Sequence, residues 1–162
     1  MSGKEKLIKQ FLESINEDQA EATDCRLIYY ETKRRYLGQW HSEKRLLFPG
    51  YIFAVTDRVD QLYNQLKKVP EFTRILGTGD DIVPLSKSEE SLLRRLSEDS
   101  ETVGMSYGVQ EGDRIIIKEG NLKGFESKIR KIDRHKRKAW IDIDLLGTER
   151  LVEVGLEIVE KR

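Results

Sequence analysis

The sequence is poor in the residues that build disulfides, thiolate metal sites and membrane segments. Cys25 is the single cysteine in 162 residues, which excludes an intramolecular disulfide and a metal site made of thiolates alone, and favours a reducing compartment. No apolar run approaches the roughly 20 residues that span a bilayer. The charged, amphipathic N-terminus is not typical of a signal peptide. We therefore expect a cytoplasmic protein without membrane contact.

Net charge is also lacking, because 29 Lys and Arg residues balance 29 Asp and Glu residues. A neutral chain has no overall attraction for nucleic acid, so a nucleic-acid site requires that cations and acids be segregated along the chain. Catalytic motifs are missing as well: there is no Walker loop, no G-x-S-x-G and no His-Cys cluster. His41 and His135 both lie in basic segments. We expect no enzyme activity, no cofactor and no metal.

One segment imitates a calcium loop. In residues 142–153, DIDLLGTERLVE, acids and a glycine occupy positions 1, 3, 6 and 12 of an EF-hand loop. Position 5, however, is Leu146, and the flanking residues alternate with the period of a strand. We predict a β-hairpin here instead of a calcium site.

Helix signals are confined to the first 100 residues. Two S-x-x-E capping boxes begin at Ser2 and Ser86, and apolar residues follow each at helical spacing. The first box predicts a helix over residues 3–16. Between these two boxes, Thr56 can cap another helix, which carries Val59, Leu62, Tyr63 and Leu66.

Strand signals alternate with these helices. Residues 24–32 predict a strand and residues 33–45 a long basic loop. The following stretch, KRLLFPGYIFAV (44–55), is apolar and aromatic, yet Pro49 and Gly50 interrupt it. Proline is confined to edges, first positions and bulges of sheets. Such a pair is therefore unexpected in the middle of a single buried strand.

The second half of the chain has a different pattern. Residues 97–110, SEDSETVGMSYGVQ, are small, polar and acidic, which is typical of a linker. Beyond them, short strands recur about every ten residues between turns that contain glycine or His135. This spacing predicts a small β-barrel after a mixed α/β domain, and hence an α+β protein.

Two motifs carry a resemblance to a known family. Residues 110–125, QEGDRIIIKEGNLKGF, resemble the KOW motif of small SH3-like barrels that bind RNA or proteins. The motif positions are held by Gly112, Asp113, Gly120, Lys123 and Gly124. The stretch LLFPGYIFAV (46–55) looks like the signature of the NusG N-terminal (NGN) domain, in which Phe-Pro-Gly-Tyr starts a strand; the resemblance thus implies that a strand is entered at Pro49. The two motifs in this order resemble NusG-family transcription factors over nearly the whole chain.

The resemblance implies an NGN α/β-sandwich domain over residues 1–98, a linker over 99–109 and a KOW barrel over 110–162. Family members begin with an aromatic strand before the first helix, and this chain starts at the helix. We expect the reading frame to extend upstream by a strand of about eight to ten residues, because loss of an interior strand would leave many backbone groups unpaired.

The resemblance also implies a function: a bacterial elongation or antitermination factor that binds RNA polymerase at its clamp region and suppresses pausing and termination. Candidate polymerase contacts are Phe48, Tyr51 and Arg45; the alternative for the two aromatics is a place in the core. Candidate contacts of the barrel with ribosomal protein S10 or the termination factor Rho are Leu122 and Phe125, and Phe125 can equally be a core aromatic.

Two basic clusters are candidates for binding nascent RNA or non-template DNA, since cations neutralise phosphates and aromatics stack on unpaired bases. The first comprises Lys33, Arg34, Arg35, Trp40, His41 and Lys44, and the second Lys128, Arg130, Arg134, Lys136, Arg137 and Lys138. The alternative for each is a solvated segment, with Trp40 packed against the protein.

Three assignments compete within this frame. The run KRRYLGQWHSEKRLLFPGYIF (33–53) is similar to specialised paralogues of the LoaP type. The chain could instead be a general NusG that acts with Rho and ribosomal protein S10. A ribosome-associated KOW RNA-binding protein would explain residues 110–162 but not the N-terminal motif. A monomer is expected in each case.

Overall fold

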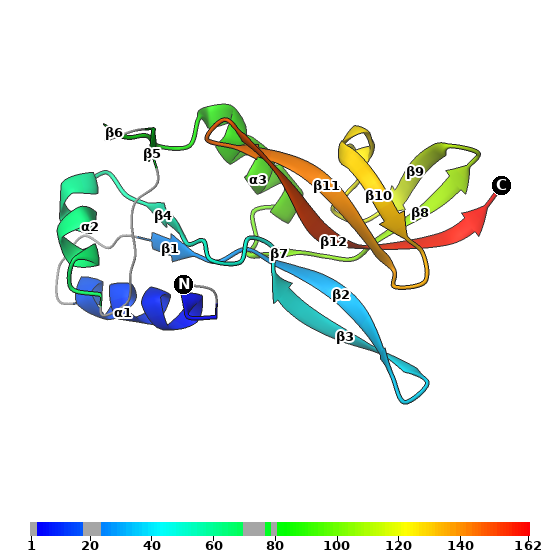
Figure 1. The fold of residues 1–162 in the computed structure, drawn as a ribbon, viewed down its shortest axis with the longest axis horizontal. Helices are drawn as coiled ribbons and strands as arrows, with labels where there is room; N and C mark the ends of the chain where they lie inside the picture. Colours follow the sequence, from blue (N-terminus) through cyan, green and yellow to red (C-terminus); the bar gives the residue numbers. More distant parts are fainter. Residues whose placement is uncertain (1–2, 18–23, 70–76, 79–80) are drawn as a thin grey trace. The chain divides into compact units, whose positions relative to one another are not determined.

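The computed structural model describes residues 3–17, 24–69, 77–78 and 81–162. Their helices and strands follow the chain as Figure 1 shows. The fold is α+β, as predicted, and it divides into two compact units. The first unit comprises residues 1–27 and 48–84, and the second unit residues 28–47 and 85–162. The domain boundaries predicted from the resemblance follow sequence order, whereas these units interleave; the boundaries stay a prediction.

The first unit is built from two amphipathic helices and short strand pairs. Its elements are α1 (Glu5–Glu17), β1 (Asp24–Arg26), β4 (Phe53–Val55), α2 (Val59–Leu66), β5 (Gly77–Thr78) and β6 (Asp81–Ile82). β1 pairs antiparallel with β4, and β5 with β6. The core is made by Ile8, Leu12, Cys25, Leu62 and Val69. Burial raises the pKa of the Cys25 thiol to about 11, so this cysteine is a small apolar core residue.

The Pro49-Gly50 pair lies before a strand and not within one. Gly50 has φ +88°, a conformation that glycine adopts without strain, and β4 begins only at Phe53. The Gly50 N–H donates to Glu5 Oε1 at 2.6 Å, and the Gly3 N–H donates to Glu5 Oε2 at 2.8 Å. A single buried carboxylate thus connects the start of α1 to the turn before β4.

The second unit holds one helix and most of the strands. Its elements are β2 (Tyr29–Tyr36), β3 (Gln39–Leu46), α3 (Lys87–Ser97), β7 (Thr102–Val103), β8 (Ser106–Glu111), β9 (Arg114–Glu119), a 3-10 turn (Glu126–Lys128), β10 (Ile129–Asp133), β11 (Lys138–Leu145) and β12 (Thr148–Lys161). One sheet has the order β3-β2-β7 and the other β10-β11-β12-β8-β9.

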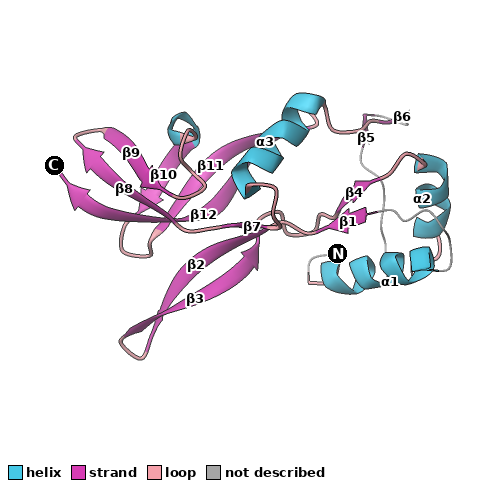
Figure 2. Ribbon diagram, turned by 180° about the vertical axis from the view of Figure 1, so that it is seen from behind, coloured by secondary structure: helices cyan, strands magenta, loops and turns pink. Residues whose placement is uncertain are grey.

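The five-stranded sheet is organised by its last strand. β12 pairs antiparallel with β11 as far as Gly155 and parallel with β8 from Leu156 onward. The side chains of β11 alternate between buried and partly exposed, and Ile141 and Ile143 are fully buried. α3 lies beside this sheet (Figure 2), where the Asn121 amide donates to the Leu96 carbonyl at 2.8 Å. We refer to the five strands as the barrel.

The segment predicted as a basic loop, residues 33–45, is a β-hairpin, so that prediction was wrong. β2 and β3 pair antiparallel from Tyr29↔Leu46 to Tyr36↔Gln39. Leu37 and Gly38 form the two-residue turn with φ of 49° and 77°, as such tight hairpins require. Charged side chains cover both faces near the turn, so no apolar alternation marked the strands, and leucine replaced the usual Asn or Asp of the turn.

The segment predicted as a linker carries strands β7 and the first part of β8. Its small residues serve close packing instead of flexibility. Ser106 is fully buried and its hydroxyl accepts the Leu122 N–H at 2.9 Å. Gly120, at φ +105°, lies so close to Ser106 that a Cβ there would approach the Ser106 Cα to 2.6 Å. Small polar composition was therefore an ambiguous sign of a linker.

Of the three helix starts predicted from the sequence, one is confirmed, one is wrong and one lies outside the described residues. The capping box at Ser86 is confirmed, because the Ser86 hydroxyl and the Glu89 carboxylate each accept the other's backbone N–H. Thr56 does not cap α2: its hydroxyl accepts the N–H of Arg58, which is the N-cap residue. The first box depends on Ser2, which lies outside the described residues.

We predict that Glu5→Ala lowers the free energy of unfolding by about 2–4 kcal/mol, because it leaves two N–H groups without their charged acceptor. Glu13→Ala is the matched control on the same helix: Glu13 makes a partly exposed pair with Lys9 at 3.7 Å, and such i, i+4 pairs contribute about 0.3–0.5 kcal/mol. Urea unfolding of both variants measures the difference. Equal losses would contradict a structural role for the Glu5 carboxylate.

Candidate nucleic-acid interface

The β2–β3 hairpin contacts the barrel through one of its faces near the tip. Trp40 pairs with Arg35, which lies two positions from Lys33 on the same strand. Because paired residues and residues two positions apart share a face of a hairpin, Lys33 and Trp40 lie on the same face. The Arg137 guanidinium lies 4.1 Å from the centre of the Trp40 ring. Lys33 lies over the Tyr107 ring, 5.9 Å from its centre. We call the face formed by Lys33 and Trp40 the docked face.

The backbones also approach closely at Gly155 of β12. A Cβ at Gly155 would overlap the carbonyl oxygen of Glu31 and the sulfur of Met105. The Glu31 carboxylate accepts the Met105 N–H at 3.5 Å. Glycine is therefore required here by the path of β2 across β12, not by its own conformation.

Two carboxylates on β12 bind side chains of the β2–β3 hairpin and of the neighbouring β10–β11 hairpin. Glu157 pairs with Lys33 at 3.9 Å and with Arg137 at 3.5 Å. Glu153 accepts a hydrogen bond from the Tyr30 hydroxyl and pairs with Lys138 at 3.1 Å. Burial and the contact with Glu153 raise the pKa of Tyr30, so the phenol stays protonated and remains a donor.

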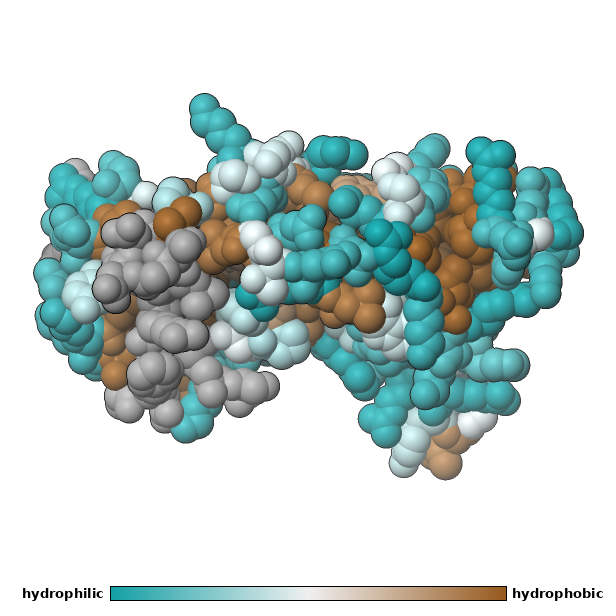
Figure 3. Space-filling view, turned by 45° about the horizontal axis from the view of Figure 1, so that its top comes forward, coloured by the Kyte–Doolittle hydropathy of each residue, from teal (hydrophilic) through white to brown (hydrophobic). Residues whose placement is uncertain are grey.

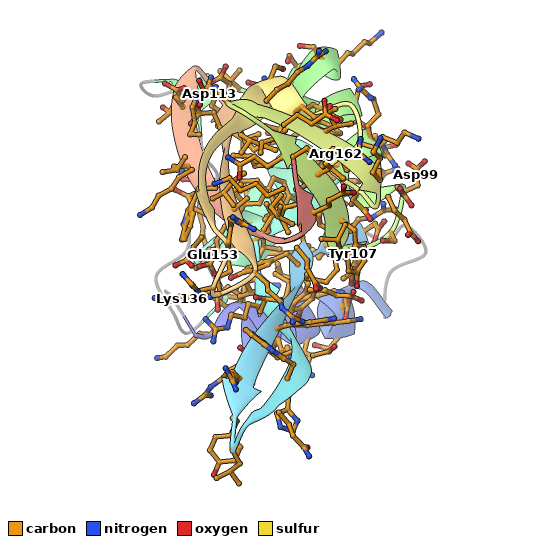
Figure 4. The ribbon with its side chains drawn as sticks, turned by 90° about the vertical axis from the view of Figure 1, so that its right-hand side faces the viewer. Asp99, Tyr107, Asp113, Lys136, Glu153 and Arg162 are labelled. Atoms are coloured by element: carbon orange, nitrogen blue, oxygen red, sulfur yellow. The ribbon has the colours of Figure 1, made fainter. Side chains whose placement is uncertain are left out.

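The opposite face of the hairpin tip points away from these contacts. It carries Arg34, Tyr36 and His41, which are all exposed. Arg34 and His41 are directly paired across the strands, and the rings of Tyr36 and His41 lie 6.3 Å apart. We call these three residues the open face. The hairpin extends beyond the barrel strands in Figure 4, where Lys136 and Glu153 are labelled.

The two basic clusters predicted from the sequence are thus partly brought together. Trp40 meets Arg137, and Lys33 shares Glu157 with it. Lys128 and Arg130 are not part of this contact: Arg130 pairs with Asp142, and a bulge between Ile129 and Lys131 breaks the strand register. Within the described chain, the predicted cations that have no ion pair are Arg34, Arg35, Lys44, Lys128, Arg134 and Lys136.

The candidate polymerase residues differ in exposure. Phe48 is only 4% exposed, and its ring packs edge-to-face on Phe53 with centres 5.5 Å apart. Tyr51 is half-buried, and Arg45 pairs with Glu43 at 2.7 Å. The core alternative stated for Phe48 thus describes this structure. The polymerase contact itself stays a prediction.

The candidate partner residues of the barrel are both interior. Leu122 is fully buried and Phe125 is 4% exposed. The Arg95 guanidinium of α3 lies 5.1 Å from the centre of the Phe125 ring. The core alternative for Phe125 thus describes this structure. A partner contact through either side chain remains a prediction, and neither is exposed for it here.

Sequence reasoning missed three residues of the contact between hairpin and barrel. Tyr30, Glu153 and Glu157 were not candidates, although the acids of β12 were visible as a group. Tyr30 and Glu153 are separated by 123 positions, and no local pattern links residues so far apart. The contacts of these three residues depend on how the β2–β3 hairpin packs against β12.

The family of the chain follows from comparison with known proteins. A family model described as "Transcription termination factor nusG" matches residues 1–94, more than half of the chain. The chain belongs to the NusG family. This confirms the resemblance seen in the two motifs.

Individual relatives extend the match into the barrel. "Transcription termination/antitermination protein NusG" of Campylobacter jejuni is 22% identical over 99% of this chain and 92% of its own length. Proteins of the same name from Bacillus subtilis and Borreliella burgdorferi are 25% and 26% identical, over 73% and 76% of this chain and 68% and 72% of their own lengths. The NusG-family likeness therefore covers both halves of the sequence.

Two further features bear on the kind of site. In the part of the chain that the structure describes, no three His, Cys, Asp or Glu side chains gather as metal ligands would. None of the described helices is long and apolar enough to cross a membrane.

We predict that Trp40 and Arg137 are energetically coupled. In a double-mutant cycle with Trp40→Ala and Arg137→Ala, urea unfolding should show a coupling of about 0.5–2 kcal/mol, the range for a cation above an indole ring. The control cycle pairs Trp40→Ala with Arg34→Ala. Arg34 lies on the opposite face, so its coupling should be close to zero. Equal coupling in both cycles would refute the docked arrangement.

Proposed function

We propose that this NusG-family chain is a transcription elongation and antitermination factor that binds RNA polymerase through its N-terminal part and suppresses pausing and termination. The observation that carries the proposal is the family match over residues 1–94. The names of the relatives join termination with antitermination, so an assay of the factor must be able to detect either direction.

The mechanism that we propose is differential binding. A factor shifts an equilibrium between paused and elongating polymerase only by the difference in its affinity for the two states. A second contact, with the nucleic acid that leaves or surrounds the enzyme, would keep the factor nearby at high effective concentration. The second unit is suited to that contact because it combines exposed cations with aromatic rings.

The ion pairs and the exposure of the cations indicate which of them are available for this contact. Arg137 and Lys138 already pair with Glu157 and Glu153, so much of their charge is neutralised within the protein. Arg34, Arg35 and Lys44 are exposed. We therefore assign the main electrostatic contact with nascent RNA or non-template DNA to the hairpin, with Arg134 and Lys136 as additional contacts.

The alternatives receive less support. A ribosome-associated KOW protein does not account for the family match at the N-terminus. A general factor that recruits Rho or ribosomal protein S10 through Leu122 and Phe125 would need these buried side chains to become accessible. A specialised role of the LoaP type agrees with the basic hairpin, and the dependence of antitermination on a leader RNA would test it.

We predict that the triple variant Arg34→Ala, Arg35→Ala, Lys44→Ala binds RNA more weakly and with a flatter dependence on salt. Each lost phosphate contact on a single strand should reduce the slope of log affinity against log salt by about 0.7. Fluorescence anisotropy at several salt concentrations measures the slope.

The control for this variant is Lys87→Ala, Lys118→Ala, Lys123→Ala, which removes the same charge from exposed positions elsewhere in the second unit. Its slope should match that of the parent chain. If both triple variants lower the slope equally, RNA responds to net charge and the hairpin is not the site.

We predict that Tyr51→Ala reduces both polymerase binding and run-through at a terminator, with little change in the melting temperature, because the ring is only half-buried. Phe48→Ala should instead lower the free energy of unfolding by about 3–5 kcal/mol, as expected for a core aromatic. In vitro transcription on a terminator template, polymerase pull-down and thermal melts measure these effects. Unchanged polymerase affinity and run-through in folded Tyr51→Ala would contradict this contact.

A further inference from the structure

The tip of the β2–β3 hairpin exposes two large apolar side chains. Leu37 is 84% exposed and Tyr36 is 58% exposed. In Figure 3 the hairpin ends in a small hydrophobic patch that is bordered by hydrophilic residues. Scattered exposed leucines are common on proteins, so exposure alone does not identify a site. The conformation of Leu37 and the charges around it provide independent observations.

Leu37 occupies a backbone conformation that disfavours leucine. Its φ is 49°, in the left-handed region that Asn, Asp and Gly adopt most readily. The turn between β11 and β12 has the same Leu-Gly sequence, with Leu146 at φ 53°. Leu146, however, is half-buried, and its N–H donates to Glu89 Oε1 of α3 at 2.8 Å. The fold thus holds Leu146 in place, whereas Leu37 adopts the same disfavoured conformation with 84% of its surface exposed.

The surroundings of Leu37 favour a polyanion. Residues 33–42 contain three cations and no acid, and of these cations Lys33 is held on the docked face by Glu157. Arg34 and Arg35 are both exposed, three and two positions before the turn; Arg34 lies on the open face with Tyr36, and Arg35 pairs with Trp40 on the docked face. An apolar tip flanked by cations and a tyrosine ring matches the chemistry of unpaired bases on a phosphate backbone.

We propose that Leu37 and Tyr36 form a wedge that packs against unpaired nucleobases of a single-stranded nucleic acid. This inference rests on the proposed nucleic-acid contact of the second unit and names its ligand. Arg34 and Arg35 hold the phosphates, Tyr36 stacks on a base, and Leu37 packs against the face of a neighbouring base. Apolar side chains such as leucine serve as wedges between bases in other nucleic-acid proteins. Duplex nucleic acid offers no free base face, so it binds only through its phosphates.

The test compares the parent chain with Leu37→Asn and Tyr36→Ser. Asn-Gly is the preferred sequence for this turn, so Leu37→Asn removes the wedge while the hairpin keeps or gains stability in a thermal melt. Oligouridine, oligothymidine and an abasic strand of equal length serve as probes in fluorescence anisotropy. The parent should prefer the strands with bases about fivefold or more over the abasic strand, the range for stacking on one aromatic ring.

Both variants should lose most of this preference and bind the abasic strand as the parent does. Leu146→Asn, the same substitution in the matching turn, should keep the preference. Stronger binding of either oligouridine or oligothymidine identifies RNA or DNA as the ligand, and both outcomes support the wedge.

Retention of the base preference by Leu37→Asn and Tyr36→Ser overturns the wedge, while the salt-dependent contact of the proposed function stands. Failure of the parent to bind any strand, the abasic one included, overturns both. Loss of polymerase affinity or of self-association in Leu37→Asn, with unchanged affinity for all strands, shows that the tip contacts protein and overturns the inference.

Discussion

The second unit depends on the crossing of β2 over β12 at Gly155. The absence of a side chain there lets the Glu31 carbonyl lie against the strand. Because the backbones meet, carboxylates on the same strand reach residues of the hairpin: Glu153 binds Tyr30 and Glu157 binds Lys33. The hairpin and the barrel therefore share one set of polar contacts, and each hairpin face near the tip acquires a different role.

This arrangement explains how a chain without net charge can present a local positive surface. The acids of β12 neutralise Arg137 and Lys138 at the barrel turn, whereas Arg34 on the open face of the β2–β3 hairpin forms no ion pair in the described structure. The cations of the two basic clusters thus fall into two groups: some, such as Arg137 and Lys138, pair with acids of the protein, and others, such as Arg34, are exposed and unpaired in the described structure. Ion pairs that are partly exposed contribute little stability individually, so the cluster orients the hairpin more than it holds the fold together.

Much of the fold was predictable from local chemistry. The Ser86 capping box, the short alternating strands after residue 110 and the turn at Gly147 each follow from a few adjacent residues. The β2–β3 hairpin was not predicted, because its strands are charged on both faces and Leu37 replaces the usual turn residue. Trp40 was predicted as a base-stacking residue, and its contact with Arg137 depends on a strand pairing that no local pattern encodes.

We propose that the hairpin contacts the barrel through Lys33 and Trp40 and binds nucleic acid through the exposed side chains near its tip, which include the open face. Nuclear magnetic resonance spectra of the chain, recorded during titration with oligouridine, test it most directly. Signals of Arg34, Tyr36 and His41 should shift while the Trp40 indole signal stays in place. Shifts at Trp40 and Arg137 with an unchanged open face would contradict it.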